Sequence, residues 1–407
     1  MERTTCAVVG GGPAGVMLGL LLARAGVEVT VLEKHKDFLR DFRGDTVHPS
    51  TLRLLDELGL GERFDRLPAT RLGEVRMHIG GTALTLSDFR RIPGPRNYIA
   101  MVPQWDFLDL LADAAAEEPS FTLRMSTAVT GLLTEGGRVT GVRYTDEHGE
   151  PGKLAAALVV ACDGRDSLVR EAAGLRPEYV EVPMDLWQVR VPAQPGSARD
   201  GRIFMRSEGR QFAATMDRGE YYQTSYLIPK GSDAQLRAQG VQWFRDRLGE
   251  LFGWGPEVTE AVTSWDDVKL LEVTMGRLRQ WYRPGLLCIG DAAHIMSPTG
   301  GVGVNLAVQD AVAAARILAG PLRSGRVDVR ELARVQRRRL MPAAAVQKAQ
   351  VSEHEAVLRP ALATGLDPHR LPVPLRMMRR VPGLPSLLGY VGGVGLRPER
   401  APDFARR

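Results

Sequence analysis

The sequence predicts an α/β protein with a parallel sheet flanked by helices, a second part that is mostly antiparallel β, and helices toward the C-terminal end. Three observations predict this fold class. The chain opens with an apolar run, a glycine triplet and a helix-like segment, TCAVVGGGPAG. Two later apolar runs also end in aspartate and glycine, at ACDG and IGDA. Between them, residues 181–275 are rich in short strand-like segments and turns.

The N-terminal motif predicts a strand, a tight turn and a helix. Residues 6–9 form the apolar run, and a G-x-G-x-x-G pattern follows it directly. Glycines in this pattern allow a positive φ, a close approach of pyrophosphate to the backbone, and helix–strand contact. Free N–H groups at the helix N-terminus would bind the phosphates. The residues of this turn are Gly10, Gly12, Pro13, Ala14 and Gly15.

Glycine triplets also occur in plain turns, so the second strand carries the argument. Residues 27–32, VEVTVL, alternate and end in Glu33, close to the ~20-residue offset at which an acid binds an adenosine ribose. These features together predict a Rossmann-like unit that binds a dinucleotide. Lys34 follows, and Arg43 in the next polar loop is placed to meet phosphates, although such loops are often only solvated.

Composition limits the classes of function. The 407 residues, 44% of them hydrophobic, suffice for a large core in two or three units. The formal charge of +5 comes from 53 basic and 48 acidic residues spread along the chain, so we expect no nucleic-acid partner. No leader or membrane span is evident, which predicts a cytoplasmic protein with no membrane partner.

The three cysteines indicate neither a metal site nor a redox pair. Cys6, Cys162 and Cys288 lie at or near the ends of apolar runs, and their spacing matches no ligand pattern. We therefore expect reduced core thiols and no metal.

The first half of the chain then predicts alternating helices and strands. We expect a helix over 49–59, a β-like pattern over 75–86 and a helix from Gln104. Strands over 121–129 and 138–145 are predicted to form a hairpin through a glycine pair.

Two later strands are predicted to join the parallel sheet. Residues 155–161 form an unbroken apolar run ending at Asp163 and Gly164, where such sheets bind ligands, although an aspartate there can also cap a helix. Residues 286–289 form another, followed by Asp291. A glycine-rich loop over 298–303 then leads into a helix; because no strand precedes it directly, it is not a second dinucleotide fingerprint.

The remaining segments are predicted to be peripheral to that sheet. Residues 202–231 predict three antiparallel strands joined by two glycine-containing turns. The helical region after Ala319 should break or kink at Pro342, and the Pro/Gly-rich sequence from Pro360 suggests an extended surface tail.

Three motifs in this order, GGGPAG with Glu33, CDGRDSLVR and GDAAHIMSPTGGVGVN, resemble those of the class A FAD-dependent aromatic monooxygenases, the para-hydroxybenzoate hydroxylase family. The resemblance covers roughly residues 4–330. It implies FAD as cofactor, NADPH or NADH as reductant and O2 as co-substrate. In that family reduced FAD forms a C4a-hydroperoxide, which transfers oxygen to an electron-rich ring.

The resemblance also implies roles for individual residues. The first motif would hold the pyrophosphate and Glu33 the ribose, while Asp163 and Gly164 match a motif implicated in both FAD and NAD(P)H binding. Asp291 would bind the ribitol of FAD, and Pro298 would lie next to the flavin ring. The backbone N–H groups of the loop that follows Pro298 would stabilise the negative charge of the reduced flavin. No catalytic side chain is implied, because the flavin carries the chemistry. The full set implied to bind cofactor is Gly10, Gly12, Pro13, Ala14, Gly15, Glu33, Lys34, Arg43, Gln104, Val129, Asp163, Gly164, Asp291, Pro298, Gly301, Val302, Gly303, Val304 and Asn305.

Departures from the family concern the substrate. Where the benzoate hydroxylase has a serine and an arginine for the substrate carboxylate, this chain has Phe212 and Ala214, which cannot bind a carboxylate. We therefore expect a larger, less anionic substrate. Which face of each strand points inward stays open. The candidate pocket residues are Gln188, Arg190, Met205, Phe212, Ala214, Tyr222 and Thr224.

The predicted domains are an FAD-binding domain (1–74, 100–180 and 276–330), a substrate domain (75–99 and 181–275) and a C-terminal helical segment with a tail (331–407). We expect a monooxygenase that hydroxylates or epoxidises an aromatic or polycyclic substrate, such as a natural product. The alternatives are a flavoprotein reductase or dehydrogenase without oxygen transfer, and a flavin-binding protein without turnover. A halogenase is disfavoured by the lack of a WxWxIP-type segment. A homodimer is one possible assembly.

Overall fold

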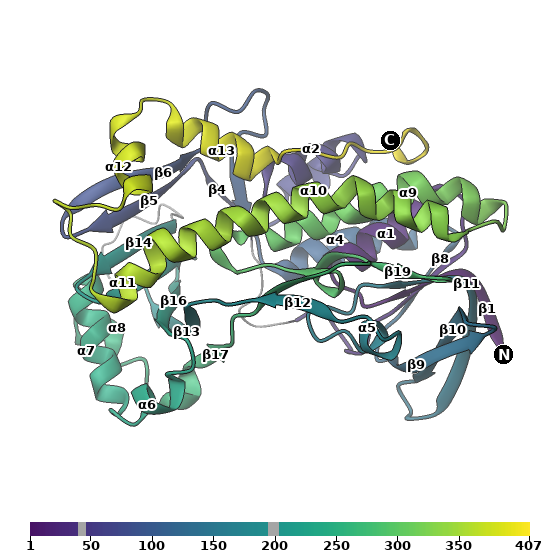
Figure 1. Ribbon diagram of the computed structural model, residues 1–407, viewed down its shortest axis with the longest axis horizontal. Helices are drawn as coiled ribbons and strands as arrows, with labels where there is room; N and C mark the ends of the chain where they lie inside the picture. The colour runs from purple at the N-terminus through teal and green to yellow at the C-terminus, as the bar shows by residue number, and fades with distance from the viewer. Residues whose placement is uncertain (40–45, 194–202) are drawn as a thin grey trace.

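The structure is a computed structural model that describes residues 1–39, 46–193 and 203–407. Two large sheets form its two halves, and the long helix α10 (Val329–Glu353) runs past both of them (Figure 1). The predicted combination of a parallel sheet, antiparallel strands and C-terminal helices is confirmed.

The parallel sheet brings the predicted motifs to one edge. Its parallel strands follow the order β20-β11-β1-β2-β8. The register pairs Val9 with both Leu32 and Ala161, and Ala161 with Cys288, so these strands end level with one another. The strand bounds are β1 Glu2–Val9, β2 Val29–Leu32, β8 Phe121–Arg124, β11 Pro151–Ala161 and β20 Leu286–Cys288.

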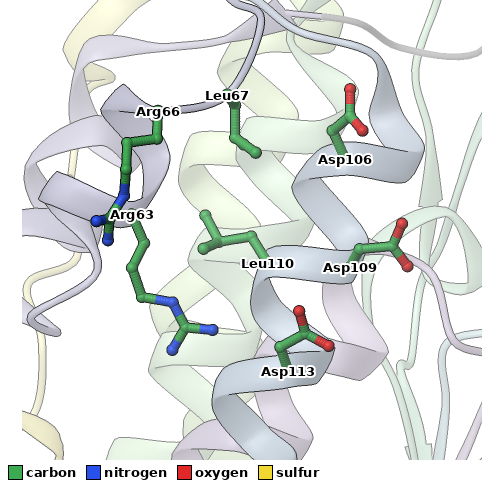
Figure 2. A pocket seen from close by; sticks show the side chains of 7 residues that line it. All are labelled: Arg63, Arg66, Leu67, Asp106, Asp109, Leu110 and Asp113. Carbon is green, nitrogen blue, oxygen red and sulfur yellow. The ribbon is translucent and has the colours of Figure 1, made fainter.

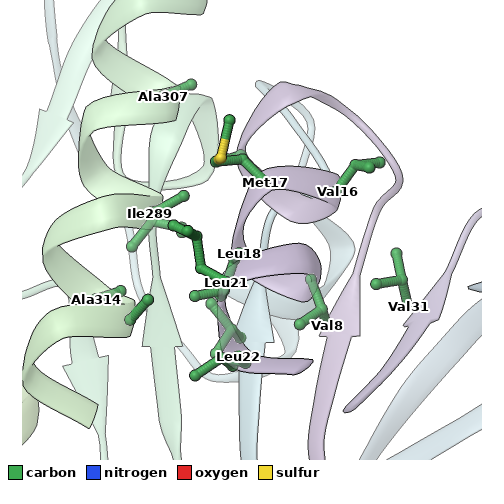
Figure 3. Packing of buried hydrophobic residues seen from close by; sticks show 14 of the residues in the cluster. Val8, Val16, Met17, Leu18, Leu21, Leu22, Val31, Ile289, Ala307 and Ala314 are labelled. Carbon is green, nitrogen blue, oxygen red and sulfur yellow. The ribbon is translucent and has the colours of Figure 1, made fainter. Parts of the chain in front are cut away.

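Two helices cover this sheet. In α1 (Pro13–Arg24), every residue from Ala14 to Ala23 is buried. Figure 3 shows α1 side chains such as Leu18 and Leu21 packing toward α9 (Gly303–Arg323) beside the strands. Because helix α1 follows β1 and helix α9 follows the β20 region, both helix N-termini lie at the edge where the parallel strands end.

The second sheet has seven strands in the order β17-β13-β16-β15-β14-β5-β6, drawn from residues 74–88 and 184–271. The three antiparallel strands predicted over 202–231 are confirmed as β14, β15 and β16. One face packs on α7 (Val241–Phe252), and the other faces the C-terminal helices. The strand bounds are β17 Lys269–Leu271, β13 Met184–Pro192, β16 Tyr221–Pro229, β15 Gln211–Asp217, β14 Ile203–Glu208, β5 Glu74–Ile79 and β6 Thr82–Asp88.

Shorter elements connect and cover the two sheets. The helices are α2 Pro49–Glu57, α3 Gly61–Asp65, α4 Gln104–Ala116, α5 Leu168–Ala172, α6 Asp233–Arg237, α8 Pro256–Thr259, α11 Arg359–Ala363, α12 Val373–Arg380 and α13 Leu384–Val394. The strands are β3 Thr46–Val47, β4 Thr70–Leu72, β7 Ile99–Met101, β9 Ala128–Glu135, β10 Arg138–Thr145, β12 Pro177–Val180, β18 Met275–Leu278, β19 Tyr282–Arg283 and β21 His294–Ile295.

Three expectations were wrong in detail. The hairpin partner of β10 is β9, because the chain breaks after β8, where Ser126 has a φ of +49°. Helix α10 continues through the buried Pro342 without a break. The segment after Pro360 is not an extended tail, since helices α12 and α13 form within it. The glycines of α13 allow its backbone to pack closely on β6: a Cβ at Gly389 would lie 2.4 Å from the Asp88 carbonyl oxygen.

Among the residues that the structure describes, one helix is long and apolar enough to cross a membrane by length and composition alone. It spans Thr299–Arg323, and 72% of its apolar window is buried inside the protein. Burial of that extent is typical of a core helix, because a membrane-spanning helix would present its apolar side chains outward.

Candidate cofactor and substrate site

The edge formed by the parallel strands carries the glycine turn. Gly10 has a φ of +101°, and a Cβ there would lie 2.5 Å from the Cys162 carbonyl oxygen, so no other residue fits. A Cβ at Gly15 would lie 1.9 Å from the Gly10 carbonyl oxygen. Gly12 differs, because a Cβ there would meet nothing within 4 Å. The turn is therefore tightly packed on its inner side and open at Gly12.

The N-terminus of α1 faces this open side. Gly12 is its N-cap and Pro13 its first residue, and no side chain of the described residues caps the helix. Pro13 has no N–H, and its fixed φ suits the first turn. The uncapped N–H groups and the positive end of the helix suit a diphosphate.

Glu33 is held beside the same turn. It is 9% exposed; its Oε2 accepts a hydrogen bond from the Gly11 N–H at 2.7 Å and its Oε1 accepts one from the His35 N–H at 3.0 Å. The Thr127 N–H donates to the Glu33 backbone carbonyl, which ties the segment just before β9, the strand that contains Val129, to the end of β2. Lys34 is exposed, and Arg43 lies outside the described residues.

Asp163 follows β11 and accepts hydrogen bonds at the start of α5, whose N-cap is Ser167. Its Oδ1 accepts from the Ser167 hydroxyl at 2.5 Å and its Oδ2 from the Val169 N–H at 3.1 Å. Burial raises the pKa of this carboxyl, and the hydrogen bonds from Ser167 and Val169 oppose that rise. The side chain thus supports the start of a helix, while Ser167 is the N-cap itself. Next to Asp163, Gly164 has a φ of +87°, and a Cβ there would meet nothing within 4 Å.

Asp291 and the glycine-rich loop complete this edge. Gly290 fits between the two helices, since a Cβ there would lie 3.4 Å from Ala14 and 3.3 Å from Ala307. Residues 292–297 and 305–315 are buried, whereas 298–304 and Asp291 are exposed or half-exposed. The loop is therefore an accessible strip within a buried region.

The start of α9 is anchored without being capped. No described side chain caps its N-terminus. The Asn305 Oδ1 accepts hydrogen bonds from Ser50 at 3.0 Å and Thr51 at 2.5 Å, so this side chain ties α9 to α2. The Gly301 carbonyl lies 3.1 Å from both the Thr46 hydroxyl and the His48 Nε2. The loop backbone is thus fixed from the α2 side.

Helix α10 holds the loop from the other side. The Gln350 Nε2 donates to the carbonyls of Ser297 and Thr299, each at 2.9 Å, and its Oε1 accepts from the Ser297 N–H at 3.1 Å. One turn earlier, Gln347 donates to the Ile295 carbonyl at 3.1 Å. The His354 Nε2 lies 3.0 Å from the Ser297 hydroxyl.

His294 belongs to a buried network. Its Nε2 lies 2.6 Å from Asp310 Oδ2, which also accepts from the Gly290 N–H. The other oxygen of Asp310 accepts from Arg339 at 2.8 Å. Burial raises the pKa of Asp310, but His294 and Arg339 outweigh it and hold that pKa below its ordinary value. The network fixes the turn that precedes Asp291.

Gln104 is the first residue of α4, and a cavity of about 270 Å³ lies further along that helix. Figure 2 shows carboxylates along one side of α4 opposite two arginines of the α3 region. The residues that line this cavity are Arg63, Arg66, Leu67, Asp106, Asp109, Leu110 and Asp113. This charged lining does not suit an apolar aromatic ring.

The seven candidate substrate residues do not share one face of the sheet. The register aligns Gln188 with Ser225, Ser225 with Ala214, and Ala214 with Met205, so these four form one half-exposed row. Ser225 was not among the candidates. On the same face, Phe212 is buried in the core and Arg190 is exposed at the next row.

Tyr222 and Thr224 lie on the opposite face. Tyr222 stacks on Trp254 with ring centroids 5.2 Å apart, and Thr224 is fully buried with its hydroxyl 2.9 Å from that of Thr215. Strand alternation places both toward α7, so the expectation that all seven line one pocket was wrong for these two.

Several residues of the site had not been predicted from the sequence. Thr46, His48 and Ser50 occur in an ordinary polar stretch, and Gln347 and Gln350 lie on an amphipathic helix. The only sequence signal was an uncharged glutamine pair on the buried side of an arginine-rich helix.

The fold and the site define an FAD-binding flavoprotein. FAD fits the residues present, because the uncapped N-termini of α1 and α9, the space at Gly12 and the accessible strip at 298–304 meet at one edge of the parallel sheet.

Comparison with known proteins gives the family. The chain belongs to the FAD binding domain family, whose model matches residues 3–349. It is 35% identical over 359 residues to the 6-methylpretetramide 4-monooxygenase of Streptomyces rimosus, covering 88% of this chain and 85% of that protein. It is 31% identical to the 12-dehydrotetracycline 5-monooxygenase/anhydrotetracycline 6-monooxygenase of Streptomyces rimosus subsp. rimosus, covering 76% of this chain and 61% of that protein.

A solved structure shows the same fold. The OxyS anhydrotetracycline hydroxylase from Streptomyces rimosus matches with a TM-score of 0.76 and 25% identity, covering 99% of this chain and 78% of that one. The predicted resemblance is confirmed, and the chain is an FAD-dependent monooxygenase with NAD(P)H as reductant.

Proposed function

We propose that this monooxygenase hydroxylates or epoxidises a polycyclic, electron-rich aromatic substrate of the natural-product type. The observation that carries the proposal is the half-exposed row of Gln188, Ser225, Ala214 and Met205, which offers neutral polar and apolar groups, while the cation on the same face, Arg190, lies exposed at the next row. A carboxylate would lack a charged partner along this row. The 6-methylpretetramide and anhydrotetracycline monooxygenases are named for polycyclic compounds, which supports the same substrate class.

The row is flanked by two apolar clusters that both lead to the glycine-rich loop. At one end, Phe212 packs in a cluster with Met275, whose strand β18 pairs with β21 just before the loop. At the other end, Met216 packs against a cluster containing Met101, which pairs with Thr46, the donor to Gly301. These two connections support placing the row opposite the loop, with the substrate between them.

The residues predicted from the sequence to bind the cofactor are proposed to contact FAD. The division of the chain into an FAD-binding domain, a substrate domain and a C-terminal segment is also a proposal. Reduced FAD would supply the oxygen chemistry. The chain would bind the diphosphate at α1, orient the ring system against residues 298–305 and exclude water with the seven-stranded sheet. Cytoplasmic location, the lack of nucleic-acid and membrane partners, and homodimer assembly also stay proposals.

The reaction can be tested by its stoichiometry. The purified yellow protein would be mixed with NADPH or NADH and a panel of phenols and polycyclic aromatics in air, while oxygen uptake, peroxide and product mass are followed. A product heavier by one oxygen supports the proposal. Peroxide alone with every compound would favour the alternative of a reductase whose reaction with O2 is only a slow side reaction.

The Asp291 contact can be tested separately. Asp291→Ala is expected to lower FAD affinity roughly tenfold or more, because a charge-assisted hydrogen bond contributes about 1.5–3 kcal/mol. Asp403→Ala, at a fully exposed carboxylate outside the three motifs, is the matched control. Equal FAD affinity in the two variants would refute the assignment.

A further inference from the structure

His48 lies between the glycine-rich loop and the end of α13. It is 2% exposed, with its Nε2 3.1 Å from the Gly301 carbonyl and its Nδ1 3.1 Å from the Gly392 carbonyl. A carbonyl oxygen can only accept a hydrogen bond, whereas a neutral imidazole has one donor and one acceptor nitrogen. A neutral His48 therefore satisfies one of these carbonyls and turns a lone pair toward the other.

Both carbonyls lie at positions where a hydrogen-bond donor would stabilise the local structure. Gly392 is in the last turn of α13, where backbone carbonyls lack helical partners and the helix dipole favours a cation. Gly301 belongs to the strip over 298–304 assigned to the flavin, and Thr46 already donates to its carbonyl. A doubly protonated His48 would bond both carbonyls and connect the loop to α13.

The surroundings oppose that charge in the absence of a nearby anion. Both atoms that the imidazole contacts are carbonyl oxygens, and Thr46, whose hydroxyl shares the Gly301 carbonyl with it, is uncharged. Burial lowers the pKa of His48, and the two carbonyl contacts oppose this without cancelling it. No charged side chain of residues 1–39, 46–193 or 203–407 contributes to the shift.

We infer that His48 takes up a proton when the flavin is reduced, and that it thereby acts as a positioning residue that locks the glycine-rich loop against α13. Hydride transfer from NAD(P)H brings two electrons and one proton to the cofactor and leaves one negative charge beside the loop. The second proton comes from solvent and resides on His48, so charge and atoms balance. The inference rests on FAD binding at this loop and deepens the proposed function.

The test is the pH dependence of the flavin midpoint potential, measured anaerobically on the holoenzyme without substrate. For a two-electron couple, the midpoint potential falls by about 30 mV per pH unit when one proton is taken up and by about 59 mV when two are taken up. Both slopes follow from the constant of about 29.6 mV per tenfold change. We expect the steeper slope in the parent near neutral pH and the shallower one in His48→Gln. His148→Gln is the matched control, since that side chain is 76% exposed in a turn, and it should keep the steeper slope.

A second measurement covers the case in which His48→Gln loses its flavin. The parent protein would be reduced with an electron donor that neither releases nor takes up protons. A pH indicator should then report two protons consumed per flavin. The absorbance spectrum should be that of the anionic reduced flavin. A one-proton uptake, a spectrum of the neutral reduced flavin, or a steep slope retained by His48→Gln would each overturn the inference. A colourless protein would instead contradict the FAD assignment itself, so the two failures are distinguishable.

Discussion

Single residues at the strand ends divide into those that shape the protein and those that leave space for the ligand. Gly10 and Gly15 are required by backbone close to their Cα atoms, whereas Gly12 and Gly164 face open space. A glycine pattern therefore contains two different constraints, one from folding and one from binding. The two can be separated by mutation.

Gly10→Ala should destabilise the apoprotein by at least about 1–2 kcal/mol, because an L-residue at φ +101° is strained and its Cβ would overlap the Cys162 carbonyl. Gly12→Ala should leave the stability of the apoprotein within about 0.5 kcal/mol but weaken FAD binding, because its Cβ would enter the space proposed for the diphosphate. Urea unfolding and flavin fluorescence titration measure the two effects. Undiminished FAD affinity in Gly12→Ala would contradict the placement of the diphosphate.

The buried histidines predict sensitivity to mild acid. Burial lowers the pKa values of His48 and His354, so the unfolded chain binds more protons than the folded one below the ordinary histidine pKa of 6.5. Stability is thus fully present above pH 6.5 and is lost as the pH falls below it. The melting temperature of the His354→Gln apoprotein should therefore rise relative to that of the parent as the pH falls from 7.5 to 5.5. A difference between the two proteins that does not change over this interval would argue against a neutral buried imidazole at His354.

At the scale of elements, α10 acts as a support for the glycine-rich loop rather than as a peripheral helix. Figure 1 shows it running along the middle of the molecule past both sheets, and its glutamines reach backbone groups on both sides of β21. The helix can therefore affect FAD binding without touching FAD.

Gln350→Leu should lower FAD affinity about tenfold, because it leaves the Ser297 N–H and two carbonyls unpaired near the flavin loop, at about 1–3 kcal/mol for each buried group. Gln336→Leu is the matched control: on the same helix, Gln336 bonds the Trp281 N–H and the Arg279 carbonyl, away from the loop. Both variants should lose stability. Only Gln350→Leu should bind FAD more weakly, and equal dissociation constants would refute the supporting role.

At the scale of the whole molecule, the C-terminal segment closes the structure by returning to the FAD-binding half. The Glu399 carboxylate is fully buried, accepts two hydrogen bonds from Arg338 at 2.6 and 2.7 Å, and lies 3.7 Å from Arg339. Arg339 in turn bonds Asp310, so the last residues are linked to the turn before Asp291.

Glu399→Gln should cost about 3 kcal/mol, because it leaves the partly buried Arg338 without a charge partner and removes one of the two carboxylates near the buried Arg339, which keeps Asp310. Asp403→Asn, at a fully exposed carboxylate four residues later, should change stability by less than about 0.5 kcal/mol. Chemical unfolding of the two variants under the same conditions makes the comparison. A small effect of Glu399→Gln would show that the tail is only loosely attached.

The sequence by itself determined the features that local chemistry controls. A glycine turn after an apolar strand, with Glu33 at the end of the next strand, predicted the dinucleotide fold, because positive φ angles and strand burial are local requirements. The order of three such motifs predicted the family, which the comparisons confirm.

The tertiary structure alone decided which residues support the loop and which face of the second sheet is open. His48 lies 253 residues from Gly301, and Gln350 lies 53 residues from Ser297, so no local pattern records these contacts. In the seven-stranded sheet, the alternation of side chains does not by itself show which face is buried. Helix α7 packs on the face that contains Tyr222, so Gln188 and Ala214 are half-exposed on the opposite face. Long-range packing fixes such choices because each depends on which surfaces bury the most apolar area together.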